Sequence, residues 1–372
     1  MSKRLYFVAG EASGDTHGAA LLEALAQSDR TLRFFGRGGP RMKKIAGGEF
    51  VDWSDRSAVL GLWEVLKQYR YFRHQFGLVI EDVRQEQPDA VVLIDYPGFN
   101  LRLARALRRA LPRLRIIYYI SPQVWAWNRR RIPQMAQYLD LMLCIFPFEA
   151  ELYNQSGLRT VFVGHPMLES LSAEKTSEAR EPDLIAILPG SRLREIRKIL
   201  PAMLQAAARI ARVEPKTRFQ IAAASPTLTR EIESMVRATS LRNVDVLTDG
   251  AASLMQRAHA GMVASGTATL EAAFYRLPFV LVYRVAWLTY LAARLVVKVK
   301  HLGMPNVLAG REIAPEFIQH RATPKGIANA LLRLMNDPEA RSLMISEFDE
   351  VMAKLGRDGA SHTAARAILE EI

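Results

Sequence analysis

Short apolar runs alternate with longer amphipathic stretches along the first half of the chain. The apolar runs, rich in valine, isoleucine and leucine, lie at 5–9, 90–95, 116–120, 141–146 and 161–163. Helical periodicity separates them, most clearly at 19–26 and 101–111. Continuous apolar runs that alternate with helices are typical of parallel strands covered on both faces. The first half therefore predicts an α/β unit built on a parallel sheet.

The same alternation restarts after a polar segment at 168–183, which is the best linker candidate. Further apolar runs lie at 184–188, 219–223, 244–247, 260–264 and 279–283, and helical sequence extends from Pro324 to the end. A chain of 372 residues is long enough for two domains. We expect two Rossmann-like parallel-sheet domains, at 1–168 and 169–343, facing an interdomain cleft. A helical tail at 344–372 is expected to cross back to the first domain.

The turn after the 184–188 run has the features of an anion site. Gly190 and Ser191 follow the buried run, and an arginine-rich helical pattern begins near Arg192. Free backbone N–H groups at a helix start attract anions, and a guanidinium matches phosphate geometry. We expect Ser191 to be the N-cap of the helix, with Glu195 one turn into it. An ordinary turn with solvated arginines is the alternative.

A second turn of this kind follows the 260–264 run. Ser265, Gly266 and Thr267 offer hydroxyl and backbone donors without bulk, and Glu271 lies about one helical turn further on. A carboxylate there can accept two hydrogen bonds from ribose hydroxyls. The two turns together suggest one diphosphate held between two loops, although Glu271 could also be a solvated helix residue.

Polar residues also follow the strands of the first half, where parallel sheets bind their ligands. Glu11, Ser13, Gly14 and Asp15 follow the first run, and Asp95 follows the 90–95 run. Two tryptophans lie in the segment 121–127 after the next strand. Such residues indicate contacts with sugar or lipid more than core packing.

Composition narrows the class of partner. The formal net charge of +12 implies an anionic partner, and arginines crowd the segments 102–115 and 129–131. The chain has no zinc-finger spacing and no RNP-like aromatic pattern, so nucleic acid is not expected as the partner. The single cysteine, Cys144, lies in an apolar run and is interpreted as a buried hydrophobe.

Two apolar stretches raise the question of a membrane. Charges interrupt the segment 278–299, so we interpret it as a strand followed by a helix from about Trp287 rather than a span. The segment 59–80 mixes aromatic and basic residues at helical spacing, which suits a membrane surface or an acyl chain, with a core-facing helix as the alternative. Its apolar positions are Leu60, Trp63, Leu66, Tyr69, Phe72 and Phe76.

Eight short motifs, taken together and in order, resemble those of the lipid-A-disaccharide synthases, bacterial glycosyltransferases of the two-domain GT-B architecture. They are GEASGD (10–15), IDYPGFN (94–100), YISPQVWAW (119–127), FPFE (146–149), FVGHP (162–166), LPGSR (188–192), SGTATLE (265–271) and PNVLAG (305–310). The last motif contains Asn306, which the resemblance marks as a site residue of unknown role.

The resemblance implies a reaction and a location. UDP-2,3-diacylglucosamine would donate its sugar to 2,3-diacylglucosamine 1-phosphate, forming a β(1→6) disaccharide phosphate at the cytoplasmic face of the inner membrane. No metal or cofactor is implied. The anionic lipid surface is then a partner. The apolar surface and the helical tail are compatible with a homodimer.

Roles follow for the carboxylates of the first domain. A glycosyl transfer that inverts the configuration of the anomeric carbon requires a base beside the acceptor hydroxyl. Asp95 is the residue that we expect to fill this role. Asp95 could instead cap the helix that starts near 100–101. Glu11 and Asp15 are reserve candidates for the base, or they bind acceptor hydroxyls with Ser13 and Gly14.

The residues described so far are also compatible with two alternative functions. One is another GT-B enzyme that uses UDP-N-acetylglucosamine, either a muropeptide transferase or a UDP-sugar epimerase. The other is a non-catalytic basic module that binds nucleic acid or membrane through its arginines.

Overall fold

The chain divides into two units, and the first of them is built from two segments that are separated in the sequence. The computed structural model describes residues 2–53, 69–287, 299–356 and 359–372. The first unit comprises Met1–Glu169 and Leu355–Ile372, and the second comprises Ser170–Lys354. The chain therefore passes between the units twice. Residues 344–354, which we expected in the tail, belong to the second unit.

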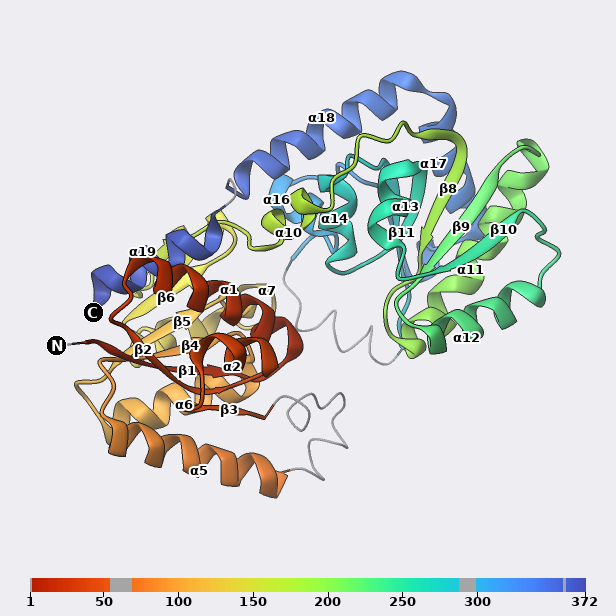
Figure 1. Ribbon diagram of the computed structural model, residues 1–372. Coiled ribbons are helices and arrows are strands. Elements are labelled where there is room, and N and C mark those ends of the chain that lie inside the picture. The colour runs from red at the N-terminus through yellow and green to blue at the C-terminus, as the bar shows by residue number, and fades with distance from the viewer. Residues whose placement is uncertain (1, 54–68, 288–298, 357–358) are drawn as a thin grey trace. The chain divides into compact units, whose positions relative to one another are not determined.

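A sheet of seven parallel strands forms the centre of the first unit (Figure 1), in the order β3-β2-β1-β4-β5-β6-β7. The strands are β1 (Arg4–Ala9), β2 (Arg33–Gly38), β3 (Phe50–Asp52), β4 (Ala90–Ile94), β5 (Arg115–Tyr119), β6 (Leu141–Cys144) and β7 (Thr160–Phe162). The helices are α1 (Ala12–Ser28), α2 (Pro40–Ala46), α5 (Tyr69–Glu86), α6 (Pro97–Ala110), α7 (Val124–Trp127), η1 (Arg129–Arg131), α8 (Ile132–Met135), α9 (Pro147–Asn154), α10 (Met167–Ala173) and α19 (Ala360–Glu371). The last turn of α10 already lies in the second unit.

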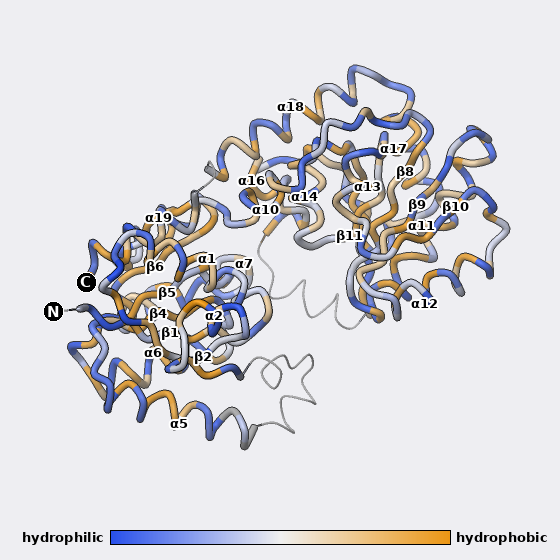
Figure 2. The backbone as a smooth tube through the Cα atoms, viewed as in Figure 1, coloured by the Kyte–Doolittle hydropathy of each residue, from blue (hydrophilic) through white to orange (hydrophobic). Residues whose placement is uncertain are grey.

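Side-chain alternation gives this sheet two buried faces. Alternate strand residues such as Phe7 and Val92 join α1, Met42 of α2 and Ile368 of α19 in one apolar core. Tyr6, on the opposite face of β1, donates a hydrogen bond to Asp82 of α5 over 2.9 Å. Figure 2 shows the strands as apolar segments flanked by helices of mixed polarity. Cys144 is fully buried in this sheet, as its apolar run predicts.

The second unit has a sheet of six parallel strands in the order β10-β9-β8-β11-β12-β13 (Figure 1). The strands are β8 (Glu181–Leu188), β9 (Arg218–Ala223), β10 (Val244–Thr248), β11 (Ala258–Ala264), β12 (Phe279–Tyr283) and β13 (Glu316–Ile318). The helices are α11 (Leu193–Val213), α12 (Pro226–Arg237), α13 (Ala251–Arg257), α14 (Ala268–Phe274), α16 (Met304–Ala309), η2 (Gln319–Arg321), α17 (Pro324–Asn336) and α18 (Pro338–Lys354).

Both sheets are entirely parallel, which confirms the α/β prediction. The segment 168–183, expected to be a linker, is only partly one, because α10 occupies 167–173. Three strands were not predicted. In β2, the sequence RFFGRG interrupts its apolar residues with arginine and glycine, while β3 and β13 are each only three residues long. Apolar periodicity is too weak a signal for strands that are this short or interrupted in this way.

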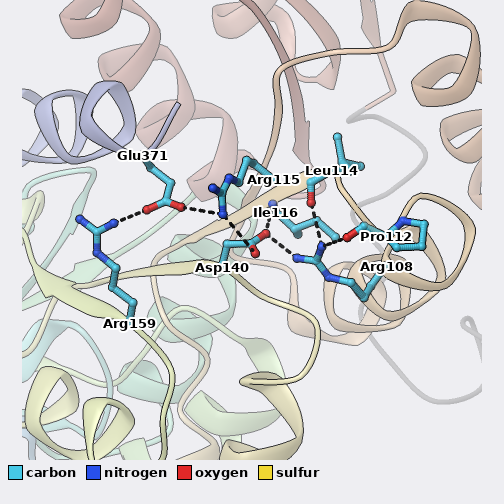
Figure 3. A network of polar contacts seen from close by, with 8 residues as sticks. All are labelled: Arg108, Pro112, Leu114, Arg115, Ile116, Asp140, Arg159 and Glu371. Atoms are coloured by element: carbon cyan, nitrogen blue, oxygen red, sulfur yellow. Dashed lines mark hydrogen bonds and ion pairs between the residues drawn. The ribbon is translucent and has the colours of Figure 1, made fainter.

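Ion pairs join the amino ends of the strands in the first unit (Figure 3). Asp140 accepts hydrogen bonds from Arg108 at 2.5 Å and from the Ile116 N–H at 2.7 Å. Glu371 of α19 pairs with Arg115 and Arg159. The last helix is therefore tied to the sheet by charge as well as by its apolar face.

Over the ranges that the structure describes, no helix is both long enough and apolar enough to cross a membrane. The segment 278–299 begins with β12, as expected for its strand part. The helix expected from about Trp287 falls almost wholly on residues 288–298, outside the described ranges.

Candidate functional site

The first group of predicted residues meets at the topological switch point of the first sheet. There β1 pairs with β4 in parallel, and Ala9 is the register partner of Ile94. The turns that begin at Gly10 and Asp95 consequently leave neighbouring strands at the same edge. In open α/β sheets this is where ligands bind.

The backbone of Asp95 is held in an uncommon conformation. Asp95 and Tyr96 have φ values of +46° and +51°, in the left-handed region. The Asp95 N–H donates to the Tyr119 carbonyl at 2.9 Å. Its own carbonyl accepts from Tyr118 Oη at 2.6 Å and Asn100 Nδ2 at 2.8 Å. Strain of this kind persists only where surrounding contacts fix it, and it is concentrated at functional sites.

Asp95 is not the N-cap residue of the following helix. Helix α6 begins at Pro97, and its N-cap, Tyr96, makes no side-chain cap bond. Burial and, to a lesser degree, the nearby Glu11 carboxylate together raise the pKa of Asp95 to about 6. Glu11 itself is exposed. The geometry thus gives a poorly solvated carboxylate, with a pKa near the working range of a general base, beside a second acid.

Gly10 allows an aromatic ring to lie against the first turn. A Cβ at Gly10 would come within 2.2 Å of Tyr96 Cδ1. The Tyr96 ring stacks on Phe99 with centroids 5.9 Å apart, and Phe99 also meets Trp53 edge-on at 5.2 Å. This aromatic group forms one wall beside Asp95.

Asp15 has a structural task in this site. Its carboxylate accepts hydrogen bonds from the backbone N–H groups of Gly39, Arg41 and Met42, each at 3.0 Å, and is 4% exposed. These donors are the orphan N–H groups at the start of α2. The structure therefore gives no support for Asp15 as a base or acceptor ligand. Ser13 is exposed, whereas Gly14 is buried within α1.

Sequence reasoning missed Glu149, although its motif was noticed. Glu149 is fully buried and accepts from Trp125 Nε1 at 2.7 Å and from the Phe146 N–H at 3.2 Å. Burial raises its pKa to about 7. Phe148 meets Trp125 edge-on at 4.8 Å. Glu149 thus holds the turn that contains Trp125, after β5, in place. The sequence signal that could have revealed this role is the acidic residue within the otherwise apolar FPFE motif.

His165 is a hydrogen-bonded, half-buried residue. Its Nδ1 accepts from the Met167 N–H at 3.2 Å, and its ring lies 5.3 Å from that of Phe146. Burial and, to a lesser degree, the nearby His17 together lower the pKa of His165 to about 4. A neutral positioning role fits these contacts.

The second group of predicted residues lies at the switch point of the other sheet. Here β8 pairs with β11, and Leu188 is the register partner of Val263. The turns at 189–192 and 265–267 therefore leave adjacent strands at one edge. Gly190 and Gly266 have φ values of +105° and +150°, which side chains other than hydrogen rarely permit.

One detail of the first of these turns was predicted wrongly. Helix α11 begins at Leu193, so its N-cap is Arg192 rather than Ser191. Arg192 is exposed and pairs with Glu195 at 3.2 Å. Ser191 is exposed as well. The guanidinium is free enough to exchange this weak surface pair for a stronger anion.

Glu271 occupies the first turn of α14, after the Ser265–Thr267 turn. It is half-buried, and burial raises its pKa, while a hydrogen bond from Thr267 acts in the opposite direction. Ser265 Oγ donates to the Leu302 carbonyl over 3.4 Å. The carboxylate thus stands beside a turn rich in donors, as a ribose contact would require.

Asn306 is an internal brace. It is 1% exposed, donates to Glu316 Oε1 at 2.9 Å and accepts from the N–H groups of Ile313 and Ala314. Glu316, which sequence reasoning missed, also accepts from the N–H groups of Leu302 and Gly303. The pair fixes the loop whose Leu302 carbonyl receives the Ser265 hydroxyl.

The predicted membrane segment is only partly described. Leu60, Trp63 and Leu66 lie outside the described residues, and the structure gives the backbone alone for Tyr69 and Phe72. Phe76 is half-buried and meets Phe99 edge-on at 5.7 Å. This residue packs at least partly inside the first unit, so it is not purely a lipid-facing position.

Solved structures with the same fold define the class of protein. UDP-N-acetylglucosamine 2-epimerase from Neisseria meningitidis, bound to UDP-GlcNAc, has a TM-score of 0.63, with 13% identity and all of both chains covered. MurG from Acinetobacter baumannii has a TM-score of 0.57, with 15% identity and 99% of both chains covered. Two parallel-sheet units with polar turns at their switch points make this a GT-B protein.

Sequence comparison identifies the family. The family model for lipid-A-disaccharide synthetase matches residues 5–368. Lipid-A-disaccharide synthase of Azotobacter vinelandii is 39% identical over 377 residues, covering 99% of this chain and 97% of the relative. That of Trichlorobacter lovleyi is 36% identical over 378 residues, covering 100% and 98%. The chain belongs to the lipid-A-disaccharide synthase family and is a glycosyltransferase.

Proposed function

We propose that the protein transfers 2,3-diacylglucosamine from UDP to the 6-hydroxyl of 2,3-diacylglucosamine 1-phosphate, with inversion. The products are a β(1→6) disaccharide phosphate and UDP. Family membership over nearly the whole chain is the observation that carries this proposal. The rival epimerase and muropeptide transferase share only the fold, at 15% identity or less among the structures compared.

In this mechanism Asp95 is the general base. Its carboxylate accepts the proton of the acceptor hydroxyl while that oxygen bonds to the anomeric carbon and the bond to UDP breaks. The raised pKa makes the carboxylate a better proton acceptor than an ordinary aspartate, while leaving it ionised at neutral pH. Exposed Glu11 and Ser13 supply polar contacts to the acceptor sugar.

Donors of the second unit would stabilise the leaving group. UDP departs as an anion, and Arg192 with the turns at Gly190–Ser191 and Ser265–Thr267 offers preorganised N–H and O–H groups. Glu271 accepts hydrogen bonds from the ribose hydroxyls. Asn306 takes a positioning role here, because it is enclosed by its own partners.

The lipid substrates place the protein at a membrane. We propose peripheral association with anionic lipid at the cytoplasmic face of the inner membrane, with segment 59–80 contacting acyl chains or bilayer. A homodimer is compatible with this arrangement, and its test is the mass measured in solution by light scattering.

The decisive experiment is product analysis by mass spectrometry with purified sugars. The acylated donor and acylated acceptor should yield the disaccharide phosphate and UDP. UDP-N-acetylglucosamine should yield neither a disaccharide nor an epimer. Turnover of the unacylated donor at a comparable rate would replace this proposal with one of the rival enzymes.

A further inference from the structure

One stretch of the first unit carries most of the excess positive charge. Between Asp95 and Asp140 there are nine arginines and not one aspartate, glutamate or lysine. The formal net charge of the whole chain is +12, so nine of those twelve charges arise here. Such segregation calls for an anionic counterpart.

Only part of this charge is neutralised within the protein. Arg108 and Arg115 pair with Asp140, as Figure 3 shows. The remaining arginines of the stretch are exposed, and none pairs with a carboxylate in the part of the chain that the structure describes. They are Arg102, Arg105, Arg109, Arg113, Arg129, Arg130 and Arg131.

Six of these seven arginines come from two neighbouring elements, and Arg113 lies in the loop that follows α6. Helix α6 exposes Arg102, Arg105 and Arg109 at spacings of three and four residues, which places them along one face. The 3-10 turn η1 exposes three consecutive arginines. Burial raises the pKa of Tyr138, and the charges of Arg105 and Arg131 both oppose that rise, so the two elements border the same tyrosine.

An exposed tryptophan lies beside the turn. Trp127 is 41% exposed, and the guanidinium carbon of Arg131 is 5.0 Å from its ring centroid. Arg129 Nε donates to the Trp125 carbonyl at 3.1 Å, which holds the turn in place. An exposed aromatic ring next to arginines is a combination found at membrane interfaces.

We propose that this arginine face, formed by α6, η1 and Trp127, docks the protein on anionic phospholipid headgroups. Six guanidiniums without a carboxylate partner, spread over a helix face and a turn, exceed what a single phosphate can engage, whereas a lipid surface offers many phosphates. The arginine face is distinct from segment 59–80. It extends the membrane association proposed above, but vesicle binding requires no sugar transfer, so failure of one idea leaves the other standing.

The test is co-sedimentation of the full chain with vesicles of phosphatidylcholine containing roughly one-third phosphatidylglycerol. The variant carries Arg105→Gln, Arg130→Gln and Arg131→Gln together. Each arginine near an anionic surface contributes about fivefold in affinity, so the triple variant should bind about a hundredfold more weakly. Its remaining binding should also depend less on salt.

A matched control removes the same charge elsewhere. Arg212, Arg230 and Arg242 are exposed residues of the second unit, and their replacement by glutamine should change vesicle binding far less. Circular dichroism and UDP binding should match wild type for both triple variants.

Three results would overturn the proposal. If the two triple variants lost equal vesicle affinity, the net charge of the protein, and not the arginine face, would explain the binding. If the wild-type protein bound vesicles of phosphatidylcholine alone as tightly as the anionic vesicles, headgroup charge could not be the cause of binding. Tighter binding of duplex DNA than of vesicles at equal salt would assign the arginine face to nucleic acid.

Discussion

The carboxylate of Asp95 illustrates how a single residue can serve chemistry at the expense of stability. Its left-handed backbone is a strained conformation, and its burial and the neighbouring Glu11 oppose the charged form that a base must adopt. Because the folded-state pKa is about 6 and the usual value is 3.8, the folded protein binds this proton more tightly than the unfolded chain. Stability from this group is therefore present at low pH and is lost as the pH rises from about 4 to about 6.

Replacing Asp95 with asparagine should separate these two effects. We expect turnover to fall by about a hundredfold or more because the base is gone, while UDP binding remains. At pH 8 the variant should be more stable than wild type by about 1–2 kcal/mol, a value reduced for partial exposure, and the gain should vanish near pH 3.

Urea unfolding at the two pH values and initial rates measure both effects. Asp245→Asn, at an exposed position of the second unit, is the control and should retain turnover. Full activity of the Asp95 variant would move the role of base to Glu11.

Asn306 permits a second prediction at this scale. Asn306→Ala leaves the N–H groups of Ile313 and Ala314 without their partner in a buried loop. We expect a loss of about 2–4 kcal/mol in the free energy of unfolding, with a raised KM for the UDP-sugar because the Ser265 turn loses its support. Asn336→Ala, at an exposed position on α17, is the control. A rise in KM without loss of stability would instead indicate direct contact with substrate.

At the scale of elements, each site residue depends on a strand end and on the helix that follows. The two strand pairs at the switch points, β1 with β4 and β8 with β11, could be foreseen because their apolar runs are long and uninterrupted. The turns after them were consequently found. Element α2 could not be foreseen, since its start is stabilised by Asp15 from a distant part of the chain rather than by a local cap.

Asp15→Ala tests that dependence directly. Helix α2 would lose the acceptor for three backbone N–H groups, and we expect a destabilisation of about 2 kcal/mol. Hydrogen exchange should accelerate within Pro40–Ala46 before other segments. Unchanged exchange together with a higher KM for the acceptor would restore Asp15 as a binding residue.

Other gaps in prediction at this scale have the same origin. Glu149 and Glu316 lie in short apolar motifs, and the sequence does not reveal their distant donors, which are Trp125 for Glu149 and the N–H groups of Leu302 and Gly303 for Glu316. Ser191 looked like an N-cap because its residue type favours that position, yet the helix starts two residues later. Residue propensity indicates a turn well and its register poorly.

For the whole molecule, the second unit is inserted into the first. Helix α18 packs in one unit, and α19 packs against α1 in the other, although few residues separate the two helices. The stability of the first unit thus depends on residues at the far end of the chain. Ile368, fully buried in the core with α1, is the most direct probe.

Ile368→Ala should destabilise the first unit by about 2–5 kcal/mol through the cavity it leaves. Hydrogen exchange in β1, β4 and α1 should accelerate, while β8 and β11 keep their protection. Val351→Ala, on the buried face of α18, should give the reverse pattern. Equal acceleration in both units after either change would mean that they unfold as one cooperative body.

Because the chain passes between the units twice, the order of synthesis also determines when the core of the first unit can be completed. The ribosome completes all seven strands of the first sheet, and then the entire inserted unit, before it makes the helix that closes the first core. Until α19 emerges, apolar side chains on α1 and β1 have no cover from that helix. Nascent chains of this protein should therefore require chaperone protection over their earliest-made part until translation is nearly finished.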